Sequence, residues 1–456
     1  MDSGTGIGGH SKSVLQMTTS KLDYESPFIV EDGVTRSHEV ILQTQSNTEN
    51  GPIEFHMQPD PEKYIDSTTF QLHGKVGLRM KHNNMWIKLP WGHNLANVED
   101  VKYGVVNNFF SSMISSCVCK LNDCEIGDTS TNSYPYLSYI QTLLGTSASQ
   151  GGSEILSSQL FIKDAPENMA TPNTTDASYH KRRKVFLERE YVDFHIPIHN
   201  DLATCEKYLP PNSKLSFIFK RVDNEFALWN AEDEEREYKI VVDDLYVTLH
   251  QLEVTPQILK NHYDKYVKAE KPLKIKFTEN VLKTFAVPRH SFEMSHHNLF
   301  FGNHLPEKVY GVIVEQAAFN GDIKKNPFFF ETAGMKEAYL TVNSVNEPTP
   351  PYQIIEGSEE NSAYLKFLAN TGTSPFEMES VNVSADDYKN GYFVLAFDRS
   401  PTRDNGLYTH KTQNGSMSIK IKCKEATPKN YMVLVFASFE KALVFHGDKV
   451  YKESIY

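Results

Sequence analysis

The sequence predicts an all-β protein made of two eight-stranded jelly-roll sandwiches in tandem, each with a short inserted helix. Three observations support this prediction: many short segments alternate apolar and polar residues, few segments have a helical period, and features of the first half return in the second half in the same order. With 456 residues the chain is also too long for one ordinary domain, which holds about 100–200 residues.

Alternation of period two is the commonest pattern along the chain. It is clearest at residues 192–198, 215–220 and 417–423, where every second residue is apolar and most of the residues between are polar. Successive side chains of a strand point to opposite faces, so such segments are strands with one buried and one solvated face. Many strands separated by Gly, Pro, Asn and Asp are typical of an antiparallel sandwich or barrel.

Three segments have a helical pattern instead. Apolar residues share one helical face at 137–144, with Gly145 ending the run, and again at 363–368. The third segment begins with Thr255 as N-cap and Pro256 in the first helical position, and it ends before Pro272. Because it lies near the middle of the chain, we expect this helix to connect two halves.

The two halves of the chain match in order. The matched segments are 103–105 with 310–312, 121–122 with 342–343, 135–136 with 351–352, 191–198 with 392–397, 214–220 with 416–422, and 238–242 with 431–435. Most offsets lie near 200 residues, and they range from 193 (238 to 431) to 221 (121 to 342). We infer a duplicated all-β domain of about two hundred residues, with a helix inserted at the same place in each copy.

This organisation divides the chain into four parts. Residues 1–50 are expected to form an N-terminal arm that is mostly unpacked in an isolated subunit, since their apolar residues are scattered. Residues 51–255 are the first jelly roll, 256–272 the connector helix and 273–456 the second jelly roll.

Composition and charge exclude several classes of protein. A composition of 39% hydrophobic and 12% aromatic residues excludes disorder and fibrous proteins. The net charge of −12 is unfavourable for a protein that coats nucleic acid, because such proteins gain affinity by neutralising phosphates. No apolar run approaches the roughly 20 residues of a membrane helix, and no secretory signal is recognisable, so the five cysteines are expected to be free thiols.

No motif predicts catalysis. Gly4, Gly6 and Gly9 satisfy a dinucleotide-binding pattern but follow no strand, and P-loop, hydrolase-elbow and zincin motifs are absent. The histidines at 195 and 199 and those at 290, 296 and 297 lack the HxH pair of a metal-binding cupin, so we expect solvent-facing or hydrogen-bonded side chains. Cys117 and Cys119 are expected in the core. The prediction is therefore no catalytic, cofactor-binding or metal-binding residues, and no cofactor.

One compact basic run, residues 180–184 with sequence HKRRK, leaves three interpretations open. It is a solvated loop, a nuclear import signal or a contact with nucleic acid. A further hypothesis concerns the aromatic residues Trp86 to Trp91 and Phe328 to Phe330, which would act as buried anchors between subunits, although core packing explains the Phe run equally well. The N-terminal arm is a second candidate for intersubunit contacts.

From about residue 50 to the end, several segments together resemble one known family. They are 52–55 (PIEF), 64–66 (YID), 106–110 (VNNFF), 134–136 (YPY), 143–144 (LL), 305–311 (LPEKVYG), 319–321 (FNG), 326–330 (NPFFF), 387–388 (DY), 391–392 (GY), 397–398 (FD) and Gly415. This ensemble resembles the major capsid proteins of Polinton/Maverick elements and of the related adintoviruses.

The resemblance implies a double jelly-roll capsid protein, similar in architecture to adenovirus hexon and to virophage capsid proteins. It implies a homotrimer whose six jelly rolls form a pseudo-hexagonal capsomer, and neighbouring capsomers that tile an icosahedral virion around a DNA genome. A separate single jelly-roll penton protein would close the vertices. It further implies synthesis in the host cytoplasm, with the host nucleus as one site of assembly, and neither enzymatic activity, sequence-specific nucleic-acid binding nor a membrane span.

Three alternatives remain open at this point. The first is a jelly-roll metal-dependent enzyme of the cupin type, for which the acidic run 232–235 offers carboxylates, although such a run is usually a solvated face. The second is a glycan-binding lectin, which should be secreted and disulfide-bonded. The third is a host protein domesticated from a Polinton capsid gene.

Overall fold

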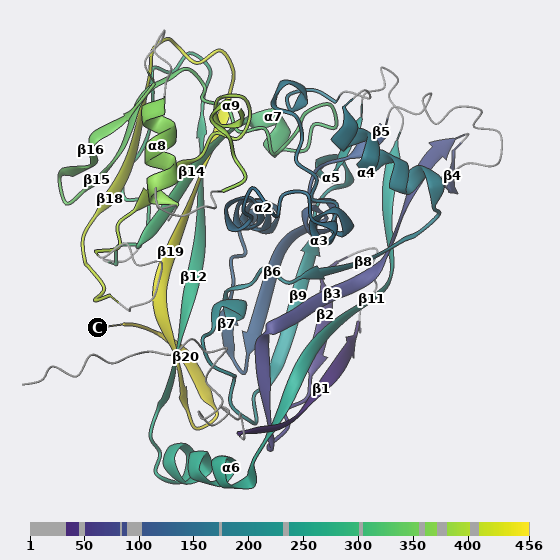
Figure 1. Ribbon diagram of the computed structural model, residues 1–456, viewed down its shortest axis with the longest axis vertical. Helices are drawn as coiled ribbons and strands as arrows, with labels where there is room; N and C mark the ends of the chain where they lie inside the picture. The colour runs from purple at the N-terminus through teal and green to yellow at the C-terminus, as the bar shows by residue number, and fades with distance from the viewer. Residues whose placement is uncertain are drawn as a thin grey trace, which may run out of the picture.

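The computed structural model describes residues 33–44, 51–82, 84–88, 103–172, 176–230, 237–300, 304–354, 361–371, 381–401 and 410–455. They form two β-sandwiches that stand side by side, with their longest strands running along the long axis of the molecule (Figure 1). Helices gather between and above the sandwiches, whereas the connector helix lies alone at the opposite end (Figure 1).

The first sandwich contains eight principal strands in two antiparallel sheets. One sheet has the order β1 (Val34–Gln43), β11 (Tyr238–Val254), β3 (Lys63–His82) and β8 (Val192–Pro197), and β4 (Met85–Lys88) extends β3 as a hairpin. The other sheet has the order β2 (Ile53–Met57), β9 (Leu215–Arg221), β6 (Ile114–Leu121) and β7 (Cys124–Ile126).

The second sandwich has the same plan. One sheet has the order β12 (Leu273–Val287), β19 (Tyr431–His446), β14 (Lys308–Glu315) and β17 (Leu395–Asp398), and β20 (Lys449–Ser454) pairs with β19. The other sheet has the order β13 (Glu293–His296), β18 (Met417–Cys423), β15 (Met335–Val342) and β16 (Val345–Gln353).

The two sandwiches have one topology. If the eight principal strands of each are counted along the chain, both sandwiches have one sheet in the order 1-8-3-6 and one in the order 2-7-4-5. Two four-stranded antiparallel sheets with these long crossovers form a jelly roll, so the predicted fold class, a double jelly roll, is confirmed.

The predicted helices form where the pattern placed them. Helices α2 (Ser133–Gly145) and α8 (Asn361–Asn370) both lie between the fifth and sixth strands of their jelly rolls. The connector is α6 (Pro256–His262), which continues as the π-helical turn η4 (Tyr263–Lys268). The remaining helical segments are α1 (Phe109–Ser112), α3 (Glu154–Ser158), η2 (Pro166–Asn168), α4 (Ala177–Glu188), η3 (Asp201–Thr204), α5 (Asn224–Ala227), α7 (Gln316–Phe319) and α9 (Ala385–Lys389).

Four of the six sequence matches fall on equivalent strands, namely the fourth, sixth, seventh and eighth. The match at the end of the fourth strand is close, since Asn122 and Asn343 both have left-handed backbones, with φ of 54° and 48°. Such a conformation suits the tight turn into the fifth strand, and Asn adopts it more readily than most residues.

The other two matches are wrong. Tyr103–Val105 form β5, which among the described strands pairs with β10 (Leu228–Asn230) in a separate two-stranded sheet. Tyr310 instead lies in β14, the third strand of its jelly roll. Pro135 lies inside α2, whereas Pro351 lies in β16. The first jelly roll uses the 20-residue β3 as its third strand and inserts a long segment after it, so similar letters fall on different elements.

The prediction of an unpacked N-terminal arm is also wrong for part of residues 1–50. Residues 34–43 form β1, which pairs with β11 along the whole strand. The alternation is weak in the sequence because only Val34, His38, Val40 and Leu42 of this strand are partly or fully buried, and polar residues occupy most other positions.

Candidate functional site: the junction of the two jelly rolls

The two hydrophobic cores interpenetrate where the jelly rolls meet. Side chains of the first jelly roll and its insertions pack into the core of the second: Val106, Tyr136, Tyr139, Ile140, Leu143, Phe161, Met169, Tyr179, Phe226 and Trp229. Side chains of the second pack into the core of the first: Ile275, Phe277, Leu443, Phe445 and Val450. This reciprocal burial joins the two sandwiches into one body.

Aromatic stacking forms the upper part of this junction. Tyr139 of α2 stacks on Phe328, with ring centroids 4.2 Å apart, and its ring meets Phe330 edge-on at 5.8 Å. Phe328 and Phe330 are fully buried, and burial raises the pKa of the Tyr139 hydroxyl far above its usual value. The hypothesis that these two Phe side chains anchor another subunit is therefore wrong, because their surfaces are already used within the chain.

The basic run folds as part of α4, and its two arginines are buried. Asp176 caps the helix by accepting a hydrogen bond from the Tyr179 N–H. Arg182, with no exposed surface, lies 2.7 Å from a carboxylate oxygen of Asp164 and donates hydrogen bonds to the carbonyls of Val105 and Ile162.

The interpretation of residues 180–184 as a solvated loop is thus wrong. Arg182 and Arg183 cannot contact nucleic acid, while Lys181 and Lys184 remain exposed. The helix was missed because its charged positions mask the apolar face formed by Tyr179, Phe186 and Leu187. A buried Arg needs a partner carboxylate, and Asp164, which lies in a loop, gives no sequence signal of that role.

Polar contacts link the buried Arg182–Asp164 pair to the second jelly roll. The Tyr392 hydroxyl donates to the Asp164 carbonyl at 2.8 Å. The Lys163 ammonium forms an ion pair with Asp387, the residue that also completes the capping box of α9 with Ser384. Burial alone would raise the pKa of Asp387, but Lys163 and Ser384 together lower it below its usual value.

The lower part of the junction is a seam along the outer edge of β12. Every second residue of that edge bonds to the first jelly roll. The Glu206 N–H donates to the Lys276 carbonyl at 3.4 Å, the Thr278 N–H donates to Thr204 Oγ1 at 2.8 Å, and the Leu282 N–H donates to Asp128 at 2.7 Å.

Asp201 holds the middle of this seam. One of its carboxylate oxygens accepts hydrogen bonds from the backbone and side-chain nitrogens of Asn280, at 3.1 and 2.9 Å. The side chain is buried, and this burial raises the pKa of the carboxyl from 3.8 to about 7, with a further contribution from Glu279. The seam therefore seals the edge of the second jelly roll with the loops of the first.

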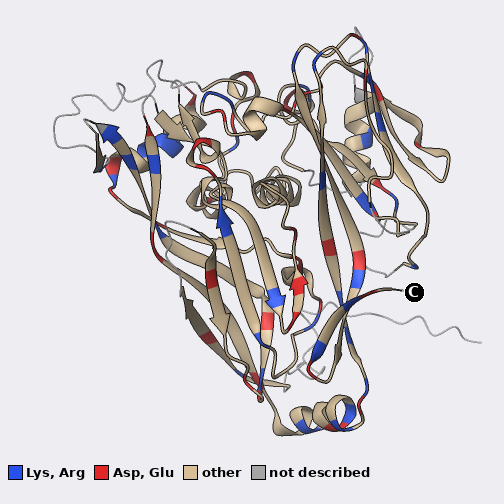
Figure 2. Ribbon diagram, turned by 180° about the vertical axis from the view of Figure 1, so that it is seen from behind, with Lys and Arg blue, Asp and Glu red and all other residues tan. Residues whose placement is uncertain are grey.

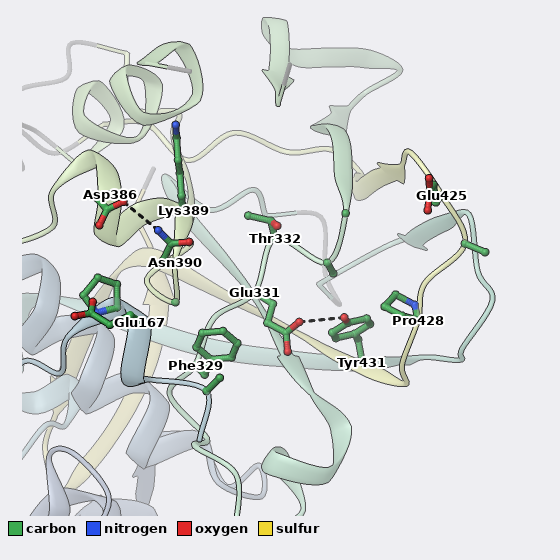
Figure 3. Close-up of a pocket in the computed structure, with 16 residues that line it drawn as sticks. Glu167, Phe329, Glu331, Thr332, Asp386, Lys389, Asn390, Glu425, Pro428 and Tyr431 are labelled. Carbon is green, nitrogen blue, oxygen red and sulfur yellow. Dashed lines mark hydrogen bonds between the residues drawn. The ribbon is translucent and has the colours of Figure 1, made fainter. Parts of the chain in front are cut away.

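A cavity of about 700 Å³ opens beside the upper junction, between the segment after η2 and the loops of the second jelly roll (Figure 3). Glu331 accepts a hydrogen bond from the Tyr431 hydroxyl at 3.1 Å, and Asn390 donates to Asp386 at 3.1 Å. Glu167 and Glu425 add carboxylates, and Phe329 supplies an apolar wall. The Tyr431 hydroxyl and the Glu331 carboxylate of this cavity are thus already paired with each other.

In the part of the chain that the structure describes, the histidines and cysteines do not assemble into a metal site. His195 is exposed on β8 and stacks with His73, whereas His199 lies beyond the end of the strand, where burial lowers its pKa to about 4. The side chains of His290, His296 and His297 are exposed, and Cys117 and Cys119 are buried in the core as predicted. Within the described ranges, no group of three or more His, Cys, Asp or Glu side chains could hold a metal ion.

Charge is mixed over both jelly rolls. In the view of Figure 2, lysine and arginine alternate with aspartate and glutamate on the sheets and on the connector helix. Five free thiols are present, of which only Cys124 is partly exposed. None of the helices in the described part of the chain has the length and apolar character needed to cross a membrane.

Some sequence-derived candidates lie outside the described residues. They are Trp91, the acidic run 232–235 and the glycines at 4, 6 and 9. Trp86 is described: it lies in β4, is 45% exposed and sits beneath the Lys81 ammonium.

The fold thus defines a double jelly-roll protein. No family model matches the chain. A protein of Caenorhabditis elegans described as uncharacterized is 20% identical over 401 residues, which cover 86% of this chain and 90% of that protein.

Three solved structures extend the comparison. A chain of the Sputnik virophage structure has a TM-score of 0.58 at 11% identity and covers 97% of this chain and 93% of its own. The mavirus major capsid protein has a TM-score of 0.53 at 12% identity, with coverage of 100% and 97%. The Faustovirus major capsid protein has a TM-score of 0.51 at 8% identity, with coverage of 95% and 93%. At these identities the similarity establishes the double jelly-roll fold over nearly the whole chain.

Proposed function

We propose that this chain is a major capsid protein of a virus or virus-like element. Three copies would form a pseudo-hexagonal capsomer, and capsomers would tile an icosahedral shell around a DNA genome. The observation that carries the proposal is the pair of jelly rolls with one strand order, fixed to each other by a buried junction. The similarity to the mavirus and Faustovirus major capsid proteins along almost the full chain supports it.

The physical logic is one of symmetry and area. A chain with two similar sandwiches gives a three-chain ring six similar faces, and a head-to-tail contact that closes forms a ring rather than a filament. Permanent interfaces of this kind bury about 2,000–5,000 Å² or more. The net charge of −12 is compatible with a shell, because a shell does not itself have to neutralise the genome.

The sequence resemblance extends the proposal to lineage and partners. We place the chain with the capsid proteins of Polinton/Maverick elements and adintoviruses, as a virion component synthesised in the host cytoplasm. Its partners would be two further copies in the trimer, neighbouring capsomers and a single jelly-roll penton protein at the vertices. We propose no enzymatic activity and no cofactor for it.

The test is expression of the full chain alone. Light scattering after size-exclusion chromatography should give a mass near three chains, and negative-stain microscopy should show hexagonal tiles or shells. A monomer at every protein concentration and salt concentration tried would contradict the proposal. Metal analysis of the same sample should find no stoichiometric metal, and a stoichiometric metal would favour the cupin-type enzyme.

A second candidate is a host protein derived from such a capsid gene. The nematode relative, which matches 86% of this chain, favours it. Both candidates allow trimers, so the discriminating measurement is made on particles purified from the source cells. Nuclease-protected DNA that copurifies with the chain supports the capsid role, whereas trimers without protected DNA support the host role.

A further inference from the structure

We propose that the free edge of β1, with the neighbouring outer face of its sheet, binds the second jelly roll of another copy of this chain. This surface would repeat between chains the contact that β12 makes within the chain. The inference rests on the proposed trimeric capsomer and specifies which surfaces form it.

The contact within the chain supplies the template. β1 and β12 are the first strands of their jelly rolls, and both pair with the eighth strand, at the edge of the sheet 1-8-3-6. The free side of β12 is sealed by loops of the first jelly roll through Lys276, Thr278, Asn280 and Leu282. Its side chains Ile275 and Phe277 are each only 1% exposed.

The equivalent surface on β1 is open within one chain. Among the described residues, β1 pairs with β11 alone, and the Ile41 side chain is 58% exposed. Beside Ile41 lies a hollow of about 890 Å³, lined by Gln43 and by outward-facing residues such as His73 and Tyr246. An open strand edge next to an apolar side chain is a site at which another chain can add.

The positions of these surfaces suit a head-to-tail ring. β1 lies on the side of the first jelly roll that faces away from the second, and β15, β16 and β18 lie on the side of the second that faces away from the first (Figure 1). If the first jelly roll of each chain contacts the second jelly roll of the next chain, first and second jelly rolls alternate around a ring. Three chains close this ring with six sandwiches.

The receiving surface follows from the same equivalence. Within the chain, β12 of the second jelly roll is held by Asp201 and Thr204 of the first, and these two residues follow the sixth strand of the first jelly roll, β8. In the second jelly roll, the sixth strand is β17, and the described residues that follow it are 399–401 and 410–413. These residues line a narrow cleft with Glu307 and Glu440. Arg399 is already paired with Glu347 and donates to the Pro306 carbonyl, so the exposed Lys411 is the positive charge that this surface offers to the exposed Glu39 of β1.

The first experiment is Ile41→Lys in the full chain, compared with Ile155→Lys on α3, another exposed isoleucine at 71% exposure. We expect the mass by light scattering to fall from three chains to one for Ile41→Lys and to stay at three for the control. Both variants should keep the circular dichroism spectrum and thermal midpoint of the unmodified protein, because both side chains are exposed. A trimer that tolerates Ile41→Lys would overturn the inference and leave the proposed function standing. An unmodified chain that never forms trimers would remove both.

The second experiment places a cysteine on each surface, Ile41→Cys and Lys411→Cys, in a Cys124→Ser background. A short bis-maleimide should link the double variant into covalent dimers and trimers, whereas each single variant should stay monomeric on a denaturing gel. Trimers in solution without these links would overturn the inference. One further outcome would assign this surface to the chain's own N-terminal segment instead of another copy. In that outcome the Ile41→Cys, Lys411→Cys double variant gives no crosslinks, and deletion of residues 1–32 abolishes the trimers.

Discussion

The two jelly rolls have the same strand order but contribute differently to the junction. The first supplies helical segments: α2 with its tyrosines, α4 with Arg182, and η3 with Asp201. The second supplies a phenylalanine pair and a long strand, β12, whose edge the first covers. The first strand of the first jelly roll has no such cover within the described chain. A duplicated fold thus diverges mainly in the segments between its strands, where contacts between copies are made.

The largest expected effect on stability comes from breaking the fully buried ion pair of the first jelly roll, Arg182 with Asp164. Arg182→Met leaves the Asp164 carboxylate buried without its partner and should lower the free energy of unfolding by about 3–5 kcal/mol. Urea denaturation followed by fluorescence measures this. Lys184→Met, on the same helix but exposed, is the control and should stay within about 0.5 kcal/mol. Equal effects of both would mean that the pair contributes nothing beyond helix formation.

A slightly smaller loss of stability is expected when the phenylalanine that the second jelly roll contributes to the junction is removed. Phe328→Ala removes the ring stacked on Tyr139 and leaves a cavity in the junction, which should cost about 3–4 kcal/mol. Phe329→Ala, at a half-buried neighbouring position, should cost clearly less. Thermal unfolding of both variants checks this order, and a larger loss for Phe329 would contradict the stacking as described.

The seam should respond to pH through Asp201. The carboxyl has a pKa of about 7 in the folded protein, above its ordinary value of 3.8. Between these values the folded chain keeps a proton that the unfolded chain has lost, so this residue makes stability fall as pH rises from about 4 to 7, with no further change above that.

Asp201→Asn retains an oxygen acceptor for Asn280 and cannot ionise. It should therefore raise stability at pH 8 by on the order of 1–3 kcal/mol, change it little at pH 4, and flatten the profile between. Asp244→Asn, at an exposed position of the first jelly roll, serves as the control. An unchanged pH profile for Asp201→Asn would show that the carboxylate is already stabilised at neutral pH.

The smallest expected effect compares a side-chain bond of the seam with an exposed side-chain bond between β1 and β11. Thr204→Val removes the acceptor for the Thr278 N–H in the seam and should cost about 1 kcal/mol. Thr35→Val removes a bond from the exposed Thr35 hydroxyl to the Glu253 carbonyl and should cost less than about 0.5 kcal/mol in the monomer. Denaturation of the two variants under dissociating conditions gives the difference, and equal costs would mean that the seam bond contributes no more than an exposed surface bond.

The sequence predicted the strands, the three helices and the duplication well, because each depends on local periodicity. The periods of 2 and 3.6 follow from backbone geometry, so 192–198, 215–220 and 417–423 could be recognised as strands without knowing their partners. The order of matched segments identified four equivalent strands correctly. Short identical letters misled at Tyr103–Val105, because three residues carry no information on which strand they pair with.

The residues of the junction could not be predicted in the same way. Arg182 looked like part of a solvated basic run, and it is buried only because Asp164 and two carbonyls meet it from other segments. Phe328 could equally have packed in a core or between subunits. The residues of β1 have too few apolar positions to stand out, and the strand exists because β11 supplies its hydrogen bonds.

Sequence alone therefore determined the all-β class, the tandem copies and the position of the connector helix, because the period of the apolar residues can be read directly from their order in the chain. Tertiary structure alone decided which charges are buried, which strand edge is sealed and which is left open. Those properties depend on contacts between separate segments of the chain, such as Asp164 with Arg182 and Asp201 with Asn280. The free energy of a charge or a strand edge is set by what lies beside it in space.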